Sequence, residues 1–327
     1  MTESVLIRAQ TGDSDAFREL TDPYRRQLQM HCYRILGSLQ DAEDVLQETL
    51  LSAWRAIDGF NGSSLRAWLY RIATTRSLNY LRSASGPPKT AVMGMGEYFA
   101  TAARSDEPWW LEPYPDALID VVHGPEARYD AREAIALSFV AGLQRLPIQQ
   151  RATLILRDVQ GFSVAEVAEM LDTTPASINT TLLRARLGLR RSEISERVPL
   201  PRSGAEAHVV DRFVCALQEG DVVEMVSVLS GDARLTMPPE PYEIRGPQKI
   251  ADFLRDVDCW GGDLRLVPTR ANNQPAFGYY RPDPTACVHR AAGIIVLTLS
   301  GTQVSRLTRF GDKGLLACFG LPRTVPR

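Results

Sequence analysis

The chain lacks long hydrophobic runs and has little cysteine, and both absences narrow what it can be. No stretch of 18 uncharged apolar residues occurs among its 327 residues, so we expect no membrane span. The N-terminus, MTESVLIRAQ, carries early charges and no long apolar segment, which argues against a secretory signal peptide. The five cysteines are scattered without a CxxC pair, which indicates a reducing cytoplasm and argues against a disulfide framework or a cysteine-based zinc site.

Neither an internal repeat nor a glycine-rich nucleotide loop occurs, and we expect no cofactor and no metal ion. The length favours two or three domains, because single cores rarely grow this large. The net charge of −2 says little about partners until the charges are located along the chain.

Helical and irregular segments alternate along the chain. Apolar residues recur at three- and four-residue steps in two stretches, which predicts helices there. The segment between them is rich in glycine and proline, and holds nine acids against three arginines from Glu97 to Glu133. After Gly204 a helical segment precedes short β-rich runs. The expected divisions are 1–84 (helical), 85–125 (acidic linker), 126–197 (helical), 198–204 (short linker) and 205–327 (α+β).

Residues 162–191, FSVAEVAEMLDTTPASINTTLLRARLGLRR, predict two short helices joined by a tight turn. Thr174 can cap the second helix, and Pro175 suits its first position. The apolar stripes expected to face the core are Val164, Val167, Ala168 and Leu171, then Ile178, Leu182, Ala185 and Leu189. Small polar side chains and arginines outside the second stripe suit base edges and phosphates. The alternative is a surface helix with a solvated basic face.

Residues 41–82 hold a second pair of contrasting helices. DAEDVLQETLLSAW is apolar on one side and acidic on the other, which suits solvent or a basic partner. The stretch that follows the polar loop FNGSS contains arginines and aromatic residues but no acid. Such a helix can track the backbone of melted DNA. The alternative is an exposed basic helix whose Trp68, Leu69 and Ile72 belong to the core.

Three stretches together resemble the extracytoplasmic-function (ECF) sigma factors of the sigma-70 family. They are DAEDVLQETLLSAW, LRAWLYRIATTRSLNYLR and LPIQQRATLILRDVQGFSVAEVAEMLDTTPASINTTLLRARLGLRR, within residues 10–195. The resemblance implies two all-α domains, a region 2 helical bundle and a region 4 helix-turn-helix. It also implies a non-enzymatic subunit that binds core RNA polymerase, through the β′ coiled coil and the β flap, and promoter DNA. From its charge we expect the acidic linker to thread the RNA channel of the polymerase, with Asp106, Glu107, Glu112, Asp116 and Asp120 in place of RNA phosphates.

The resemblance also assigns roles to individual residues. Expected contacts with core polymerase are Asp44, Gln47 and Glu48. Expected contacts with the −10 element are Phe60, Asn61, Ser63, Arg71, Thr75, Arg76 and Asn79. Expected contacts with the −35 element are Ser177, Asn179, Thr180, Arg184, Arg186, Arg190 and Arg191.

Residues 205–327 resemble a SnoaL-like domain of the NTF2-like fold, a cone of helices packed across a curved antiparallel sheet. Some actinobacterial ECF sigma factors carry such a domain, and RVPLPRSGAE favours the sigma-G-like branch over the branch with a DGGGK-type motif. Candidates for acid–base chemistry in the cone are Asp211, Asp252, His289 and Arg290, but a lone strand histidine is more often structural. We therefore expect regulation in cis, with an unidentified small ligand in the cone as an open possibility.

Two other functions compete with this interpretation. One is an independent DNA-binding regulator that uses only the helix pair of residues 162–191, which would leave residues 41–82 unexplained. The other is an enzyme of the NTF2-like class with a helical N-terminal addition. If specific DNA binding requires polymerase, the independent regulator is excluded. The enzyme interpretation would require catalytic turnover by isolated residues 205–327.

Overall fold

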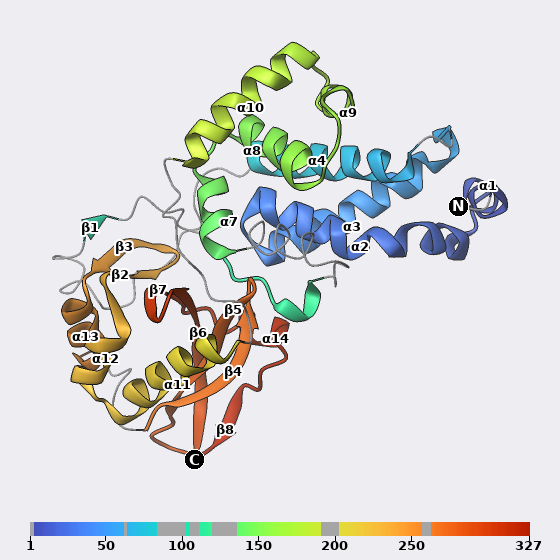
Figure 1. Cartoon of the computed structure of the whole chain (residues 1–327). Helices are drawn as coiled ribbons and strands as arrows, with labels where there is room; N and C mark the ends of the chain where they lie inside the picture. The colour runs from blue at the N-terminus through green and yellow to red at the C-terminus, as the bar shows by residue number, and fades with distance from the viewer. Residues whose placement is uncertain are drawn as a thin grey trace. The chain divides into compact units, whose positions relative to one another are not determined.

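The computed structural model describes residues 3–61, 64–83, 103–104, 111–119, 136–190, 203–256 and 263–327. They form two compact units (Figure 1). The first unit contains the two helical segments. The second contains the α+β segment together with the described residues 103–104 and 111–117, which the sequence places in the linker.

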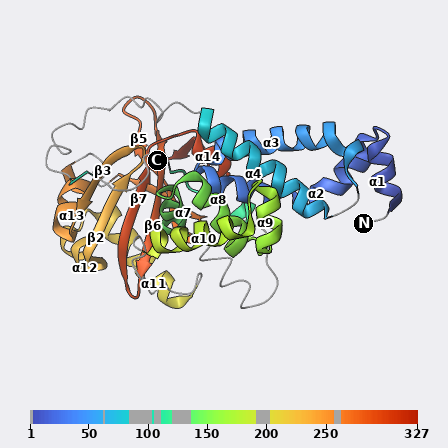
Figure 2. The ribbon, with the colours of Figure 1, turned by 90° about the horizontal axis from the view of Figure 1, so that it is seen from above.

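The N-terminal lobe of the first unit consists of α1 to α4. Their bounds are α1 Glu3–Gln10, α2 Ser14–Leu36, α3 Leu39–Ala56, the 3-10 turn η1 Ile57–Gly59 and α4 Leu65–Ser83. Asp13 caps α2 by accepting from two backbone N–H groups, and Gly37 ends it in the left-handed conformation that glycine tolerates, φ 78°. Helices α2, α3 and α4 pack against one another (Figure 2).

The helix-turn-helix lobe of the first unit consists of α7 to α10. Their bounds are α7 Leu137–Gln144, α8 Ile148–Leu154, a π-helical turn η3 Ile155–Val159, α9 Val164–Met170 and α10 Pro175–Arg190. The expected cap is confirmed, since the N–H of Ser177 donates to Thr174 Oγ1 at 3.2 Å and α10 starts at Pro175. The stripe of Ile178, Leu182, Ala185 and Leu189 is buried as predicted.

The second unit is built on one curved sheet. Its helices are α11 Gly204–Glu219, α12 Val222–Val228, α13 Pro247–Asp256 and α14 Leu315–Cys318. Its strands are β1 Ala103–Arg104, β2 Leu229–Met237, β3 Glu240–Arg245, β4 Arg265–Ala271, β5 Gln274–Pro282, β6 Val288–Ser300, β7 Gln303–Phe310 and β8 Thr324–Pro326. The strand order is β1-β3-β2-β7-β6-β5-β4, and β8 pairs with β6.

One strand pair departs from the expected antiparallel sheet. Strands β2 and β7 are parallel, with Leu235 opposite Leu307, whereas the other named pairs are antiparallel. Helix α13 connects the β2–β3 hairpin to the meander β4–β7. This crossover lets the last strand of the meander lie beside β2 in the same direction.

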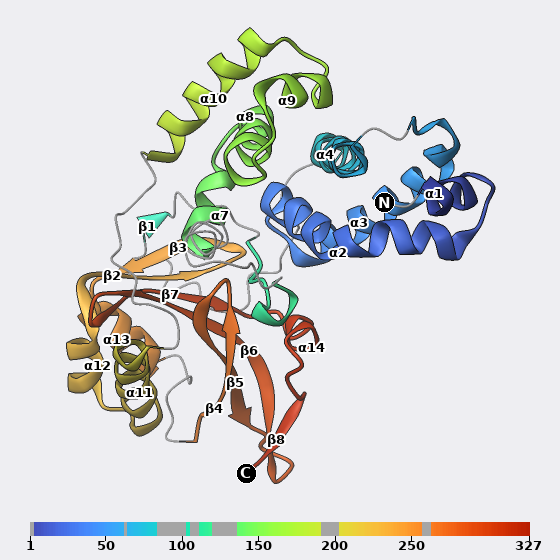
Figure 3. The same ribbon diagram turned by 45° about the vertical axis from the view of Figure 1, so that its right-hand side comes forward.

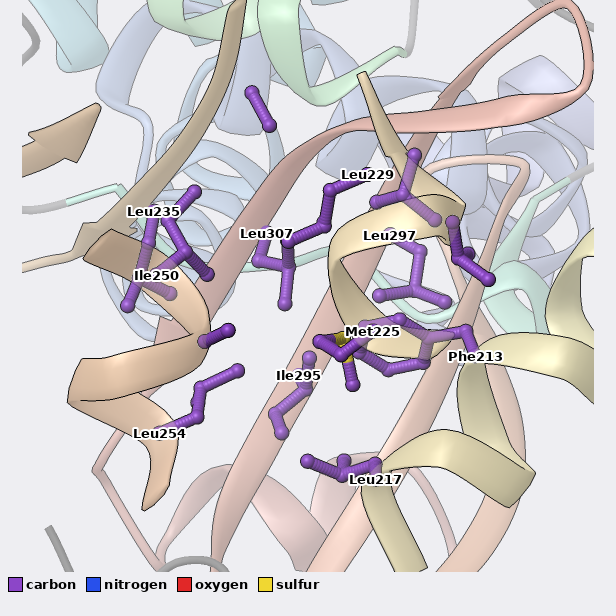
Figure 4. Close-up of a cluster of buried hydrophobic side chains, with 14 of the residues drawn as sticks. Phe213, Leu217, Met225, Leu229, Leu235, Ile250, Leu254, Ile295, Leu297 and Leu307 are labelled. Carbon is purple, nitrogen blue, oxygen red and sulfur yellow. The ribbon is translucent and has the colours of Figure 1, made fainter. Parts of the chain in front are cut away.

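The core of the second unit lies between the sheet and helices α11, α12 and α13, which gather on one face of it (Figure 3). Phe213 and Leu217 of α11, Met225 of α12 and Leu254 of α13 point toward the strands (Figure 4). The facing strand residues are Leu229, Leu235, Ile295, Leu297 and Leu307. Helices gathered on one face of a curved sheet are the arrangement expected for an NTF2-like fold.

Candidate nucleic-acid and polymerase interface

Helix α3 presents an acidic stripe at its surface. Asp44, Gln47 and Glu48 are exposed, because the apolar positions of the helix turn inward. Leu51 continues this stripe one turn later and is 55% exposed, although it is a large apolar side chain. An exposed leucine beside carboxylates suits a protein partner with a basic and apolar surface. Leu51 is not among the predicted contacts with core polymerase, although an apolar residue seven positions after Asp44 and outside the buried stripe marks it in the sequence.

Helix α4 brings four of the predicted −10 residues to one exposed face. Arg71, Thr75, Arg76 and Asn79 lie at i, i+4, i+5 and i+8, and all are exposed. No acid occurs in α4, so nothing on this helix neutralises the two guanidinium groups. The face can pair with phosphates and donate hydrogen bonds to unstacked bases.

A buried polar contact helps to hold α4 against α2. The Nε2 atom of His31 lies 2.8 Å from Thr74 Oγ1, and the hydroxyl of Thr74 donates to the carbonyl of Tyr70 at 2.7 Å. Burial lowers the pKa of His31 to about 3, so the ring is neutral at physiological pH. A neutral, hydrogen-bonded pair specifies how α4 sits on α2 without burying a charge.

Phe60, a predicted −10 contact in the loop before α4, is buried. This side chain is only 5% exposed, because its ring packs 5.0 Å from the ring of Trp68, centroid to centroid. The ring therefore anchors the loop within the N-terminal lobe instead of facing solvent. Asn61, the next residue, is exposed, and Ser63 lies outside the described residues.

The N-terminal half of α10 presents the predicted polar residues. Ser177, Asn179, Thr180 and Arg184 are exposed. Helix α9 in front of α10 begins with a capping box in which Ser163 and Glu166 bond each other's backbone N–H groups. The pair has the geometry of a helix-turn-helix, and its second helix exposes small polar side chains in the N-terminal half, the part that reads bases in such motifs.

Arg186 differs from the other predicted −35 residues because it already has a protein partner. Its Nε and Nη2 atoms donate to the two carboxylate oxygens of Asp158 at 2.9 and 2.7 Å. These hydrogen bonds raise the pKa of the guanidinium. The Arg186 side chain is 51% exposed and bridges α10 and the π-helical turn, so a phosphate contact would have to share the guanidinium with Asp158. Arg190 ends the helix, and Arg191 lies outside the described residues.

The candidates for chemistry in the second unit lie on three elements, α11, α13 and β6. His289 is buried, and its Nε2 atom lies 2.9 Å from Asp263 Oδ1 and 2.7 Å from the Asp263 carbonyl oxygen. Arg290 pairs with Asp283, Asp252 pairs with Arg255 on α13, and Asp211 is exposed on α11. The partner of His289, Asp263, lies 26 residues away in the sequence and was not predicted. Among the described residues no cluster of three or more His, Cys, Asp or Glu suits a metal ion.

Part of the acidic segment is clipped to the β4–β5 hairpin. The buried Tyr114 donates its N–H to Asn272 Oδ1 at 2.8 Å and accepts from the Asn272 N–H at 2.9 Å. Asp116 accepts from Arg270 Nε at 3.2 Å and from the Asn273 N–H at 2.8 Å. We call these contacts the linker clip. In the clip, the Asp116 carboxylate accepts two hydrogen bonds from the β4–β5 hairpin. These bonds would have to break for Asp116 to enter the RNA channel of the polymerase as expected.

Two family profiles match the helical lobes. Sigma-70 region 2 matches residues 20–86, and Sigma-70, region 4 matches residues 136–189. The first range contains most of the N-terminal lobe with the α3 stripe and the α4 face, and the second contains the helix-turn-helix lobe. The described part of the chain has no helix long and apolar enough to cross a membrane. These matches define the class: a sigma-70 type subunit for promoter recognition.

Relatives extend the match over the second unit. The chain is 38% identical over 317 residues to the ECF RNA polymerase sigma factor SigG of Mycobacterium tuberculosis, which covers 94% of this chain and 85% of the relative. It is 31% identical over 245 residues to SigJ of the same organism, covering 70% of this chain and 69% of that relative. The chain therefore belongs to the ECF sigma factors of the sigma-70 family, and it binds core RNA polymerase and recognises promoter DNA. The predicted resemblance is confirmed.

A solved structure supports the fold of the whole chain. The crystal structure of the Mycobacterium tuberculosis ECF sigma factor SigJ matches with a TM-score of 0.63 at 23% identity. The match covers 94% of this chain and 99% of that chain. At this identity the likeness establishes the fold alone.

Proposed function

We propose that the three exposed surfaces of the first unit divide the work of promoter recognition. The acidic stripe of α3 binds the β′ coiled coil of core polymerase, the α4 face holds the melted −10 strand, and α10 enters the major groove at −35. The helix-turn-helix lobe would also contact the β flap. Since polymerase and promoter are cytoplasmic, we expect the protein to act in the cytoplasm.

The observation that carries this proposal is the sorting of charge between the helices. Asp44 and Glu48 are exposed on α3, whereas Arg71 and Arg76 are exposed on α4, which contains no acid. Opposite charges on separate faces suit a protein partner on one side and nucleic acid on the other. A stand-alone regulator would need only the helix-turn-helix lobe.

Binding to core polymerase and to promoter DNA tests the division. The full-length protein should co-elute with bacterial core polymerase, and Glu48→Lys should weaken this association while Arg76→Ala leaves it unchanged. Arg184→Ala should cost about 1–3 kcal/mol in promoter binding if the guanidinium contacts a base. Specific promoter binding by the protein without polymerase would instead support the stand-alone regulator.

We propose further that the second unit regulates the sigma regions in cis by holding the segment that joins them. The linker clip supports this, because Tyr114 and Asp116 lie between the two matched sigma regions in sequence but pack on the β4–β5 hairpin. A change in the cone, including one caused by a small ligand, would alter this hold. We propose a regulatory and not a catalytic role, since Asp252 is paired with Arg255 and His289 with Asp263.

A pair of glycine variants in the β4–β5 turn tests the clip. Asn272 and Asn273 have φ of 55° and 59°, and glycine accepts this conformation readily. Asn272→Gly removes the Oδ1 acceptor of the Tyr114 N–H, whereas Asn273→Gly keeps the backbone groups that bond Asp116 and Arg270. Asn272→Gly should change transcription in a reconstituted assay, and Asn273→Gly should not. If Asn272→Gly and Asn273→Gly had equal transcription activity, the linker clip would not be the means of regulation.

A further inference from the structure

Gln10, at the end of α1, reaches a loop that begins 47 residues later. Its Nε2 atom donates to the Ile57 carbonyl at 3.1 Å and to the Phe60 carbonyl at 2.9 Å. A side-chain amide has two N–H donors, so one Gln10 side chain can satisfy both acceptors. Gln10 lies outside residues 20–86, the range matched by the region 2 profile.

The two carbonyls frame the turn that leads into the proposed −10 loop. The N–H of Phe60 donates back to the Ile57 carbonyl at 3.1 Å, which closes the 3-10 turn η1. The Phe60 ring is buried against Trp68 of α4, and the Phe60 carbonyl accepts a hydrogen bond from Gln10 of α1. Phe60 is therefore attached to both helices. Asn61 follows directly, and its backbone position depends on both attachments.

Helix α1 is itself held firmly enough to act as a brace. Val5, Leu6 and Ala9 are buried, and α1 packs against α2. Arg8 bonds Asp13, which caps α2, with Arg8 Nη2 2.6 Å from Asp13 Oδ2. A donor on a packed helix restrains its acceptors more than a donor on a free chain end would, because the helix backbone itself moves little.

We propose that Gln10 is a positioning residue for recognition of the −10 element. It fixes the Ile57 and Phe60 carbonyls and thereby the backbone from which Asn61 meets an unstacked base. The inference rests on the proposed role of the α4 face and its preceding loop. A residue that only tied α1 to the lobe would affect stability, but it would not affect the choice between bases.

The experiment uses full-length protein with bacterial core polymerase and a promoter that the wild-type holoenzyme opens. Gln10→Glu keeps the shape of the side chain but removes both donors, and Gln10→Ala removes the group altogether. Gln27→Glu is the matched control, since it adds the same charge at an exposed position of α2. Permanganate reactivity of melted thymines is measured on the matched promoter and on a version with one substituted −10 base. Core affinity and the thermal midpoint are recorded for each variant.

Gln10→Glu should reduce opening of the matched promoter about tenfold, as expected for the loss of two neutral hydrogen bonds. Its preference for the matched over the substituted promoter should shrink, while core affinity and the Gln27→Glu control stay at the wild-type level. Gln10→Ala should also reduce promoter opening and the preference for the matched promoter. If Gln10→Glu does not fold, the result for Gln10→Ala tests the proposal. An equal loss on both promoters, or no loss, overturns the positioning role. Failure of the wild-type protein to open any promoter overturns the proposed function instead.

Discussion

The Nη1 atom of Arg151 lies 2.5 Å from the carbonyl oxygen of Ile35, and this contact joins the helix-turn-helix lobe to the end of α2. The same guanidinium bonds the side-chain and backbone oxygens of Gln144 and the carbonyl of Leu146. Burial lowers the pKa of Arg151 to about 10, so it remains charged at neutral pH. A cation at the C-terminal end of α2 is favoured by the helix dipole.

Replacing this cation should destabilise the first unit. Arg151→Met keeps much of the volume but leaves the carbonyls of Ile35 and Leu146 without this donor, so the free energy of unfolding should fall by about 3 kcal/mol. Urea unfolding measures the change. Arg25→Met, at an exposed position of α2, is the matched control and should change the free energy by no more than about 0.5 kcal/mol. Similar losses for both variants would contradict the role of the buried contact.

The buried His31 should make the first unit sensitive to acid. Its pKa is about 3 in the folded protein and about 6.5 in the unfolded chain, so the unfolded chain binds the proton first as pH falls. Stability from this group is fully present above pH ~6.5 and declines below it, by up to about 1.4 kcal/mol per pH unit. His31→Gln should make the free energy of unfolding fall less steeply between pH 6 and 4, with His208→Gln at an exposed position as control. If the free energy of unfolding of wild type and of His31→Gln changed equally with pH, the buried His31 would not be the source of the acid sensitivity.

The ion pair of Arg186 and Asp158 should limit how many phosphates α10 can neutralise. Asp158→Ala releases the guanidinium, so the slope of log K against log salt for promoter binding should steepen by about 0.9. Glu169→Ala removes a charge from exposed α9 without releasing an arginine. If this control steepens the slope as much, the effect is one of net charge and not of Arg186.

The exposed Leu51 should contribute to binding of core polymerase. Leu51→Ser should weaken association by about 1–2 kcal/mol if the side chain is buried in the complex. Stability should barely change, because the residue is 55% exposed in the free protein. Ile7→Ser on α1 is the matched control at the same 55% exposure, and it should leave core affinity unchanged. If Leu51→Ser left the affinity for core polymerase unchanged, Leu51 would not be part of the polymerase contact.

Local patterns in the sequence determined most of the elements and the chemistry of the exposed faces. The stripe from Ile178 to Leu189 and the cap at Thr174 depend on neighbours within one or two turns, and both were predicted. The short β-rich runs predicted after Gly204 correspond to strands of the second unit, and their local signal was the turn residues between them. Strand β3 and helix α13 were not singled out, although Ile250, Phe253 and Leu254 of α13 recur at helical steps and are buried.

Only the tertiary structure decided which candidate residues are open to partners. Phe60 packs against Trp68, Arg186 bonds a carboxylate 28 residues away, and Asp116 accepts a hydrogen bond from the N–H of Asn273, 157 residues away. No periodicity or capping rule within a segment encodes such contacts, since they depend on how distant elements pack. The sequence by itself therefore determined the family, the helices and the surface charge. The packing decided which side chains face a partner and which hold the protein together.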